Sequence, residues 1–450
     1  MHEAQASVAP DGGARACRAA AKPANVARHA FPIPAAAMSA ANPTAGRAAF
    51  RHPAFVRYWA ARFLAFVAIM MQAVAIGWQV YDITHDPLSL GLVGLAGFTP
   101  AIGLALVTGH VADRFDRRRI LVVAYATELA AALLLLALAA GGNARAWPIY
   151  GAILLYGTAR AFAMPAGQAL LPNLVPPEHF PNAVAWNSSA MQVAMIGGPA
   201  LGGLLFALGA QIVYAVSASF LLAALLLMIS VPRPARAAPA RREPVSWTTL
   251  LAGIAFIRAK PAILGAISLD LFAVLFGGAT ALLPIYARDI LHVGPLGLGI
   301  LRSGPAIGAM TTALVLTHRP LTRHVGRKMF VCVAGFAVAT IVFGLSTSFA
   351  LSLAALVALG ACDMISVFVR QTLVQIATPD QMRGRVSAVN SVFIGASNEL
   401  GEFESGVTAA WLGTVPAVVI GGLGTLLVCV LWAWRFPQLR DIDRLERDRL

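Results

Sequence analysis

The sequence predicts an all-α membrane protein with about twelve transmembrane helices in two pseudo-symmetric bundles of six. Three observations support this fold class: an apolar composition, a regular series of apolar stretches, and an internal repeat. Of the 450 residues, 58% are hydrophobic and 12% are charged. No soluble core can hide so many apolar side chains, whereas a bilayer accepts them on every outward-facing helix surface.

Apolar stretches long enough to cross a hydrocarbon core of about 30 Å follow one another along the chain. In the first bundle, over residues 51–231, we expect spans at 56–80, 88–111, 119–141, 147–171, 184–208 and 211–231. In the second, over 261–436, we expect them at 261–286, 296–317, 328–347, 350–374, 387–412 and 415–435.

The segments outside the two bundles have a different composition. Residues 1–50 are rich in Ala, Pro and Arg, and we expect a disordered tail there, with Met38 as an alternative start and a transit peptide as the remaining alternative. The linker at 232–260 contains Pro and Arg and ends in a stretch expected to form an amphipathic helix in the membrane interface. Residues 437–450 are expected to form a C-terminal tail.

Basic residues gather in the loops on one side of the predicted spans. By the positive-inside rule, both termini and the linker are cytoplasmic, which agrees with an even number of spans. The formal net charge of +14 is therefore a sign of topology and does not indicate nucleic-acid binding.

The two halves of the chain repeat at a shift of 203 residues. The shift places QALLPNLVPPEHFPNAVAWNS (168–188) over QTLVQIATPDQMRGRVSAVNS (371–391), with matching Gln, Pro, Asn and Ser residues. Two duplicated six-span bundles are the architecture of carriers that rock around a central site.

The stretch GHVADRFDRRR (109–119) lies between the second and third predicted spans. It resembles the G-x-x-x-D-R-x-G-R-R loop of the major facilitator superfamily at Gly109, Asp113, Arg114, Arg117 and Arg118, while Asp116 stands where the family has a second glycine. We expect Asp113 to face the N-terminal end of span 11 when the bundles close on the cytoplasmic side, so that the loop latches this gate. The alternative is that the arginines only set topology.

Other stretches resemble the exporter group of this superfamily that includes drug:proton antiporters and the enterobactin exporter. They are HPAFVRYWAARF, THDPLSLGLVG, LLAGIAFIRAKP and TPDQMRGRVSAVNS. The resemblance implies the major facilitator fold and a secondary exporter of the inner membrane.

Several charged residues fall inside predicted spans, where charge is costly unless it faces a cavity or a partner. Arg160 and Asp363 are equivalent in the repeat, and we expect them to face each other across the central cavity. Arg370, on the same helical face as Asp363, and Asp270 in span 7 are expected to complete this polar floor. The alternative is a static ion pair.

Span 11 contains three acids in the segment SNELGEFESG. Glu399 and Glu402 share one helix face, and Glu404 points elsewhere. Mutual repulsion favours binding of a proton by at least one of them, as a proton-coupled carrier requires. The alternative is that these acids pair with Arg302 or Arg370 for packing.

The repeat equivalent of this acidic segment is IGGPALGG in span 5. Gly198, Pro199, Gly202 and Gly203 match the G-P-x-x-G-G core of the antiporter signature of exporters in the superfamily. Small residues and a proline predict a close, bendable contact between the bundles.

Together, these features predict a monomeric, proton-driven exporter of an amphipathic small molecule, drug-like or siderophore-like, with no cofactor and no metal. Four scattered cysteines lack metal-ligand spacing. The alternatives are an importer of a small organic solute and, more remotely, a membrane sensor or a membrane-embedded enzyme. The sequence contains no HExxH, GxSxG or nucleotide-binding loop, so we expect no enzymatic activity.

Overall fold

The computed structural model describes residues 46–104, 107–108, 111, 114–232 and 247–444. The described part of the first half contains α1 (Pro53–Thr84), α2 (Pro87–Gly103), α4 (Arg117–Ala140), α5 (Trp147–Leu170), α6 (Phe180–Phe206) and α7 (Ala210–Ser230). Three short 3-10 turns, η2 (Ala48–Arg51), η3 (Leu171–Asn173) and η4 (Pro177–His179), lie beside them.

The second half begins with α8 (Trp247–Ala259) and α9 (Pro261–Phe276). The path of α9 continues through η5 (Ala279–Leu282), α10 (Leu283–Ile285) and one π-helical turn, η6 (Tyr286–Ile290). The remaining helices are α11 (Gly294–His318), α12 (Val325–Leu345), α13 (Phe349–Ala377), α14 (Asp380–Leu412), α15 (Thr414–Arg435) and α16 (Pro437–Arg440).

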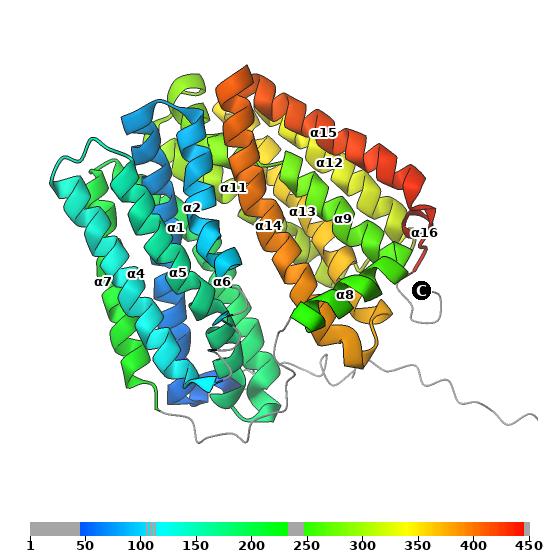
Figure 1. Ribbon diagram of the computed structural model, residues 1–450, viewed down its shortest axis with the longest axis horizontal. Coiled ribbons are helices and arrows are strands. Elements are labelled where there is room, and N and C mark those ends of the chain that lie inside the picture. The colour runs from blue at the N-terminus through cyan, green and yellow to red at the C-terminus, as the bar shows by residue number, and fades with distance from the viewer. Residues whose placement is uncertain (1–45, 105–106, 109–110, 112–113, 233–246, 445–450) are drawn as a thin grey trace, which may run out of the picture. The chain divides into compact units, whose positions relative to one another are not determined.

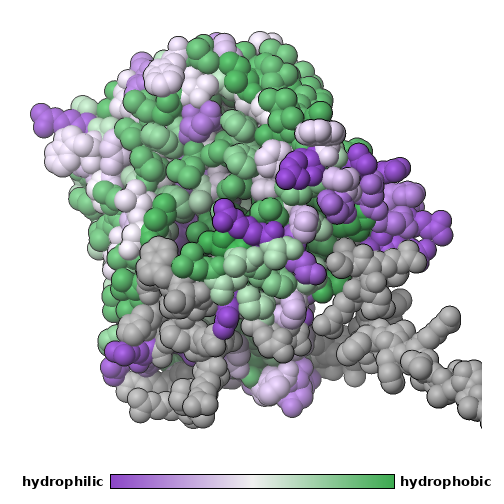
Figure 2. Space-filling view, turned by 45° about the vertical axis from the view of Figure 1, so that its right-hand side comes forward, coloured by the Kyte–Doolittle hydropathy of each residue, from purple (hydrophilic) through white to green (hydrophobic). Residues whose placement is uncertain are grey.

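Within the described residues, nine helical segments are long and apolar enough to cross a membrane. The helices α2, α5 and α14 complete two sets of six, since α2 packs against α5 and α14, and α5 packs against α4. Figure 2 shows hydrophobic side chains over most of the visible helical surface, with hydrophilic residues gathered mainly at its lower edge and right-hand side. The predicted all-α membrane fold of two six-helix bundles is confirmed.

Packing separates the two halves and also joins them. In the first half, α1 packs against α6 and α7, and α4 packs against α7; in the second, α11 and α12 pack against α13, and α9 packs against α14 and α15. Among the described residues, the most extensive packing between the halves is that of α2 with α14, which lie beside each other in Figure 1, and of α6 with α11. The repeat exchanges these two pairs, so the interface follows the duplication.

Residues 48–50, which lie within the predicted tail at 1–50, are part of the described fold. In η2, Ala49 is fully buried and its N–H donates to Asn182 Oδ1 at 3.0 Å, while Phe50 packs edge-on against Trp59. These contacts tie residues 48–50 to the first bundle. Residues 1–45, including Met38, lie outside the described residues.

The described part of the predicted C-terminal tail, residues 437–444, packs on the second bundle. Gly326 N–H, in the first turn of α12, donates to Ile442 O at 2.9 Å, and His324 N–H donates to Asp443 Oδ1 at 2.9 Å. This hydrogen bond from the backbone holds the pKa of Asp443 below its usual range. Residues up to Arg444 thus cover the start of α12, whose first N–H groups lack partners within the helix.

Candidate transport site

The two bundles have two ends, which the course of the chain distinguishes. The terminal side is where α1 begins at Pro53 and α15 ends at Arg435, and the far side is where α1 ends at Thr84 and α14 ends at Leu412.

On the far side, polar side chains of the two halves bind each other. Asp82 at the end of α1 forms an ion pair with Arg288 of η6, and the Tyr81 hydroxyl donates to Asp289. The Arg288 guanidinium also lies 6.0 Å from the centroid of the Tyr81 ring. We call these four residues the clasp. Each half contributes one acid and one partner for the acid of the other half.

The clasp rests on a local structure that occurs twice. His85 and His292 both adopt the left-handed conformation, each with φ of 51°, directly after the helical turn that bears the clasp acid. Their Nδ1 atoms lie 3.0 Å from Tyr81 O and 2.9 Å from Arg288 O. Sequence reasoning missed the clasp, although the repeated DITH (82–85) and DILH (289–292) was a signal for it.

Glycines let the crossing helices approach each other closely toward the far side. A Cβ on Gly203 of α6 would stand 3.0 Å from Gly299 Cα of α11, and a Cβ on Gly406 of α14 would stand 2.7 Å from Gly91 Cα of α2. Only glycine fits at such distances between two backbones.

The predicted glycine and proline contact in α6 has two different faces. Gly198 and Gly202 lie against α1 of their own half, where a Cβ on Gly202 would stand 2.7 Å from Met71 O. Pro199 and Gly203 lie against Gly299 of α11, across the interface. The expected contact between the halves is therefore made by Pro199 and Gly203. The bending of α6 at this contact stays a prediction.

On the terminal side, part of the loop at 109–118 is described. Gly109 and Asp113 lie outside the described residues, and Arg114 is exposed. Arg117 donates to Ala169 O at 3.0 Å and Arg118 Nε donates to Met228 O at 3.3 Å, so both bind helix ends of their own half.

Asp116, which stands at the position of the family's second glycine, has a capping role. Its Oδ1 accepts a hydrogen bond of 3.0 Å from Arg118 N–H, so it caps the start of α4.

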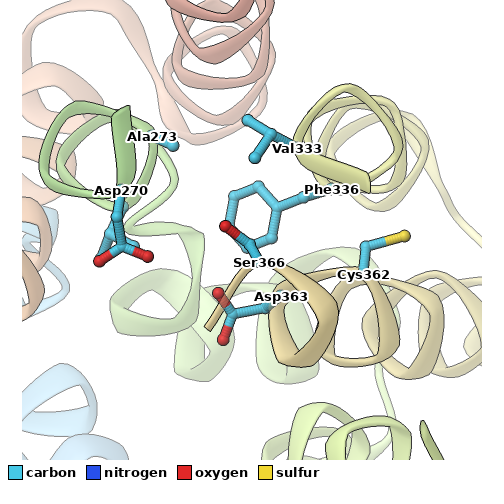
Figure 3. Close-up of a pocket in the computed structure, with 8 residues that line it drawn as sticks. Asp270, Ala273, Val333, Phe336, Cys362, Asp363 and Ser366 are labelled. Carbon is cyan, nitrogen blue, oxygen red and sulfur yellow. The ribbon is translucent and has the colours of Figure 1, made fainter. Parts of the chain in front are cut away.

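The expectation that Arg160 and Asp363 face each other is wrong. Arg160 Nη1 of α5 lies 3.7 Å from Glu399 Oε1 of α14, which makes an ion pair across the two halves. Asp363 of α13 instead lines a small cavity between α9, α12 and α13 of the second half (Figure 3). Equivalent positions in a repeat are related by symmetry, and this relation does not aim the two side chains at each other.

Arg370 joins three helices of the second half. Its side chain is 2% exposed, Nη2 lies 3.3 Å from Asp270 Oδ2 of α9, and Nη1 donates to Asn390 Oδ1 of α14 at 2.9 Å. Its Nε has no hydrogen-bond partner in the described part of the chain. This geometry is that of a buried structural ion pair.

The acids of α14 divide as their helical spacing predicts. Glu399 and Glu402 lie at the interface, where Arg160 and Arg302 are the cations that act on both, and a Cβ on Gly94 of α2 would stand 3.0 Å from Glu402 Oε2. Glu404 faces away and accepts a hydrogen bond of 2.8 Å from Thr408.

A small cavity lies between α9, α12 and α13 of the second half (Figure 3). The carboxylates of Asp270 and Asp363 and the hydroxyl of Ser366 point into this space. Its free volume of about 10 Å³ is on the order of one water molecule. Apolar residues and a thiol complete the lining: Ala273, Val274, Val333, Phe336 and Cys362. Among the described residues, no three His, Cys, Asp or Glu side chains gather as metal ligands.

Two homologous six-helix halves, joined on one side and with paired charges between them inside the membrane, define a transporter of the major facilitator superfamily. The chain belongs to the transmembrane secretion effector family of this superfamily, whose sequence profile matches residues 44–449. It is a multi-pass membrane protein and a secondary transporter, and not an enzyme.

Individual relatives agree with this assignment. The chain is 28% identical over 396 residues to the enterobactin exporter EntS of Shigella dysenteriae, covering 86% of this chain and 93% of that protein. It is 27% identical over 391 residues to EntS of Citrobacter koseri, with the same coverage.

Solved structures share the fold at low sequence identity. A mutant form of the nucleoside transporter NupG matches with a TM-score of 0.67 and 14% identity, covering 85% of this chain and all of that one. A bacterial homologue of the iron transporter ferroportin matches with a TM-score of 0.64 and 14% identity, covering 86% and 99%.

Proposed function

We propose that this transporter exports an amphipathic small molecule, drug-like or siderophore-like, in exchange for protons. Similarity to enterobactin exporters over 93% of their length supports export. The basic loops on the terminal side support an inner-membrane orientation with both termini in the cytoplasm. Under this proposal the joined far side separates the central site from the outside, and cargo enters from the cytoplasm or the inner leaflet.

The observation that carries the coupling mechanism is the Arg160–Glu399 ion pair between the halves. A proton on Glu399 neutralises the carboxylate and releases Arg160, so protonation weakens a bond that exists only when α5 and α14 are close. Glu402, which lies in the field of Arg160 and Arg302, is the second proton carrier. Glu404, bound to Thr408, has a packing role in this scheme, and Arg370 with Asp270 holds α9, α13 and α14 together.

The transport cycle also requires the far side and the terminal side to open and close in turn. The clasp and the Gly203–Gly299 contact must part for cargo to leave on the far side. The loop containing Gly109, Asp113, Arg114, Arg117 and Arg118 then closes the terminal side against the start of α14. Cargo leaves, a proton from outside binds Glu399 or Glu402, and the halves return. Release of this proton to the cytoplasm then lets the Arg160–Glu399 ion pair form again.

Transport by purified protein in liposomes tests this proposal. A panel of amphipathic drugs and catecholate siderophores is offered while the internal pH is recorded. We expect at least one cargo to move protons in the opposite direction, and Glu399→Gln to abolish this coupling. Movement of cargo and protons in the same direction would indicate an importer, and unchanged coupling in Glu399→Gln and Glu402→Gln would refute the proton assignment.

A further inference from the structure

The cavity between α9, α12 and α13 is separate from the charges at the interface of the halves, and its own charges do not balance. Asp270 is paired with Arg370, whereas Asp363 has no hydrogen bond or ion pair among the described residues. The charged groups that act on Asp363 are Asp270 and Arg370. Two carboxylates and one guanidinium leave one negative charge, which is costly inside a protein within a membrane.

A second observation indicates what restores the balance. Ser366 is 3% exposed and lines this cavity, and its hydroxyl has no hydrogen-bond partner in the described part of the chain. Buried polar groups almost always find a partner, and a hydroxyl oxygen offers lone pairs to a cation or to water. Together with Asp363 it presents oxygens to a space of about one water molecule (Figure 3).

The charge balance of Asp270, Asp363 and Arg370 favours one positive charge. The Phe336 ring borders the same space, and an aromatic face attracts a cation. A divalent ion would leave the group with an excess positive charge, whereas a monovalent cation balances it.

We propose that Asp363, Asp270 and Ser366 bind one monovalent cation, Na⁺ or a hydrated proton, and that this is the site of a coupling ion in the second half. The inference rests on the proposed coupled transport and places an ion away from Glu399. Asp363 is the main ligand, Ser366 and Asp270 add oxygens, and Arg370 holds Asp270 in place.

Thermal unfolding of the purified full-length protein tests the site, because a ligand that binds the folded state raises the Tm. The Tm is measured in NaCl or choline chloride at equal ionic strength, and at pH values from 5 to 8. We expect Na⁺ or low pH to stabilise the wild type. A response to Na⁺ at constant pH identifies sodium as the ion, and a response to pH alone identifies the proton.

Three variants distinguish binding at this site from a general effect of salt or pH. Asp363→Asn should lose the cation-dependent shift and, in choline at pH 8, should melt higher than the wild type because its uncompensated charge is gone. Ser366→Ala should weaken the apparent affinity about ten-fold, the usual effect of losing one contact with a charge. Glu178→Gln, which removes an exposed acid in η4, should behave as the wild type does.

The proposal is overturned if neither Na⁺ nor pH changes the Tm of the wild type, or if Asp363→Asn keeps the full response. These measurements need no cargo, so they separate the two hypotheses. A cation response without any export would leave this site standing while the proposed function fails, and export without a cation response would do the reverse.

Discussion

The far side and the terminal side of this transporter are held by different kinds of bonds. On the far side, the clasp and the close glycine pairs join the first half to the second. On the terminal side, Arg117 and Arg118 donate hydrogen bonds to backbone carbonyls of their own half. Bonds that cross the halves favour one conformation over the other, whereas bonds within a half stabilise both conformations equally. Substitutions on the two sides should therefore differ in kind as well as in size.

The largest effect is expected from removing the space between α6 and α11. Gly203→Ala places a methyl group against Pro295 O, and such overpacking typically costs about 1–3 kcal/mol. Since the cost falls on the state with a closed far side, we expect transport to fall about five-fold or more. The matched control is Gly197→Ala on the same helix, where a Cβ meets nothing within 4 Å. Equal transport by the two variants would show that the close contact is dispensable.

A shift of similar or smaller size is expected from opening the clasp. Tyr81→Phe removes a hydrogen bond to a carboxylate, which is worth roughly 1.5–3 kcal/mol. Asp82→Asn removes an ion pair, which is worth up to about 1 kcal/mol. Spin labels on the two halves at the far side should report a larger fraction of long distances, more for Tyr81→Phe than for Asp82→Asn. The exchange Asp82→Arg with Arg288→Asp should restore the short distances, and a failure of this rescue would argue against a direct pair.

The matching test on the terminal side should leave the conformational equilibrium unchanged. Arg118→Ala removes bonds to carbonyls at the end of α7, at a cost of about 1 kcal/mol in stability. We expect a lower Tm and unchanged far-side distances in the same spin-label experiment. A change in these distances would mean that the arginine also acts between the halves and that the two sides are not so different.

The smallest effect is expected from Asp443, which lies in the C-terminal segment and binds the residue before α12. Its pKa is lowered by the bond from His324 N–H, so its contribution to stability is present above the unfolded pKa of about 3.9 and is lost as the pH falls through the lower folded value. Asp443→Asn should lower the Tm slightly at pH 7, and the difference from the wild type should disappear in strong acid. A constant difference at all pH values would assign the effect to packing instead of charge.

The sequence by itself determined the membrane class, the two six-helix halves and the family. Apolar stretches, loop arginines and the shift of 203 residues are patterns along one chain, and a bilayer converts such patterns directly into spans. Helical spacing likewise placed Glu399 and Glu402 together and Glu404 apart, because it depends only on a rotation of about 100° per residue.

The tertiary structure alone decided which charges pair. Arg160 binds Glu399 and not Asp363, Asp82 binds Arg288, and Asp270 binds Arg370. These partners lie on different helices, up to 239 residues apart in the case of Arg160 and Glu399. Their meeting depends on how the helices rotate and cross when their side chains pack, and no periodicity along a single helix contains that information.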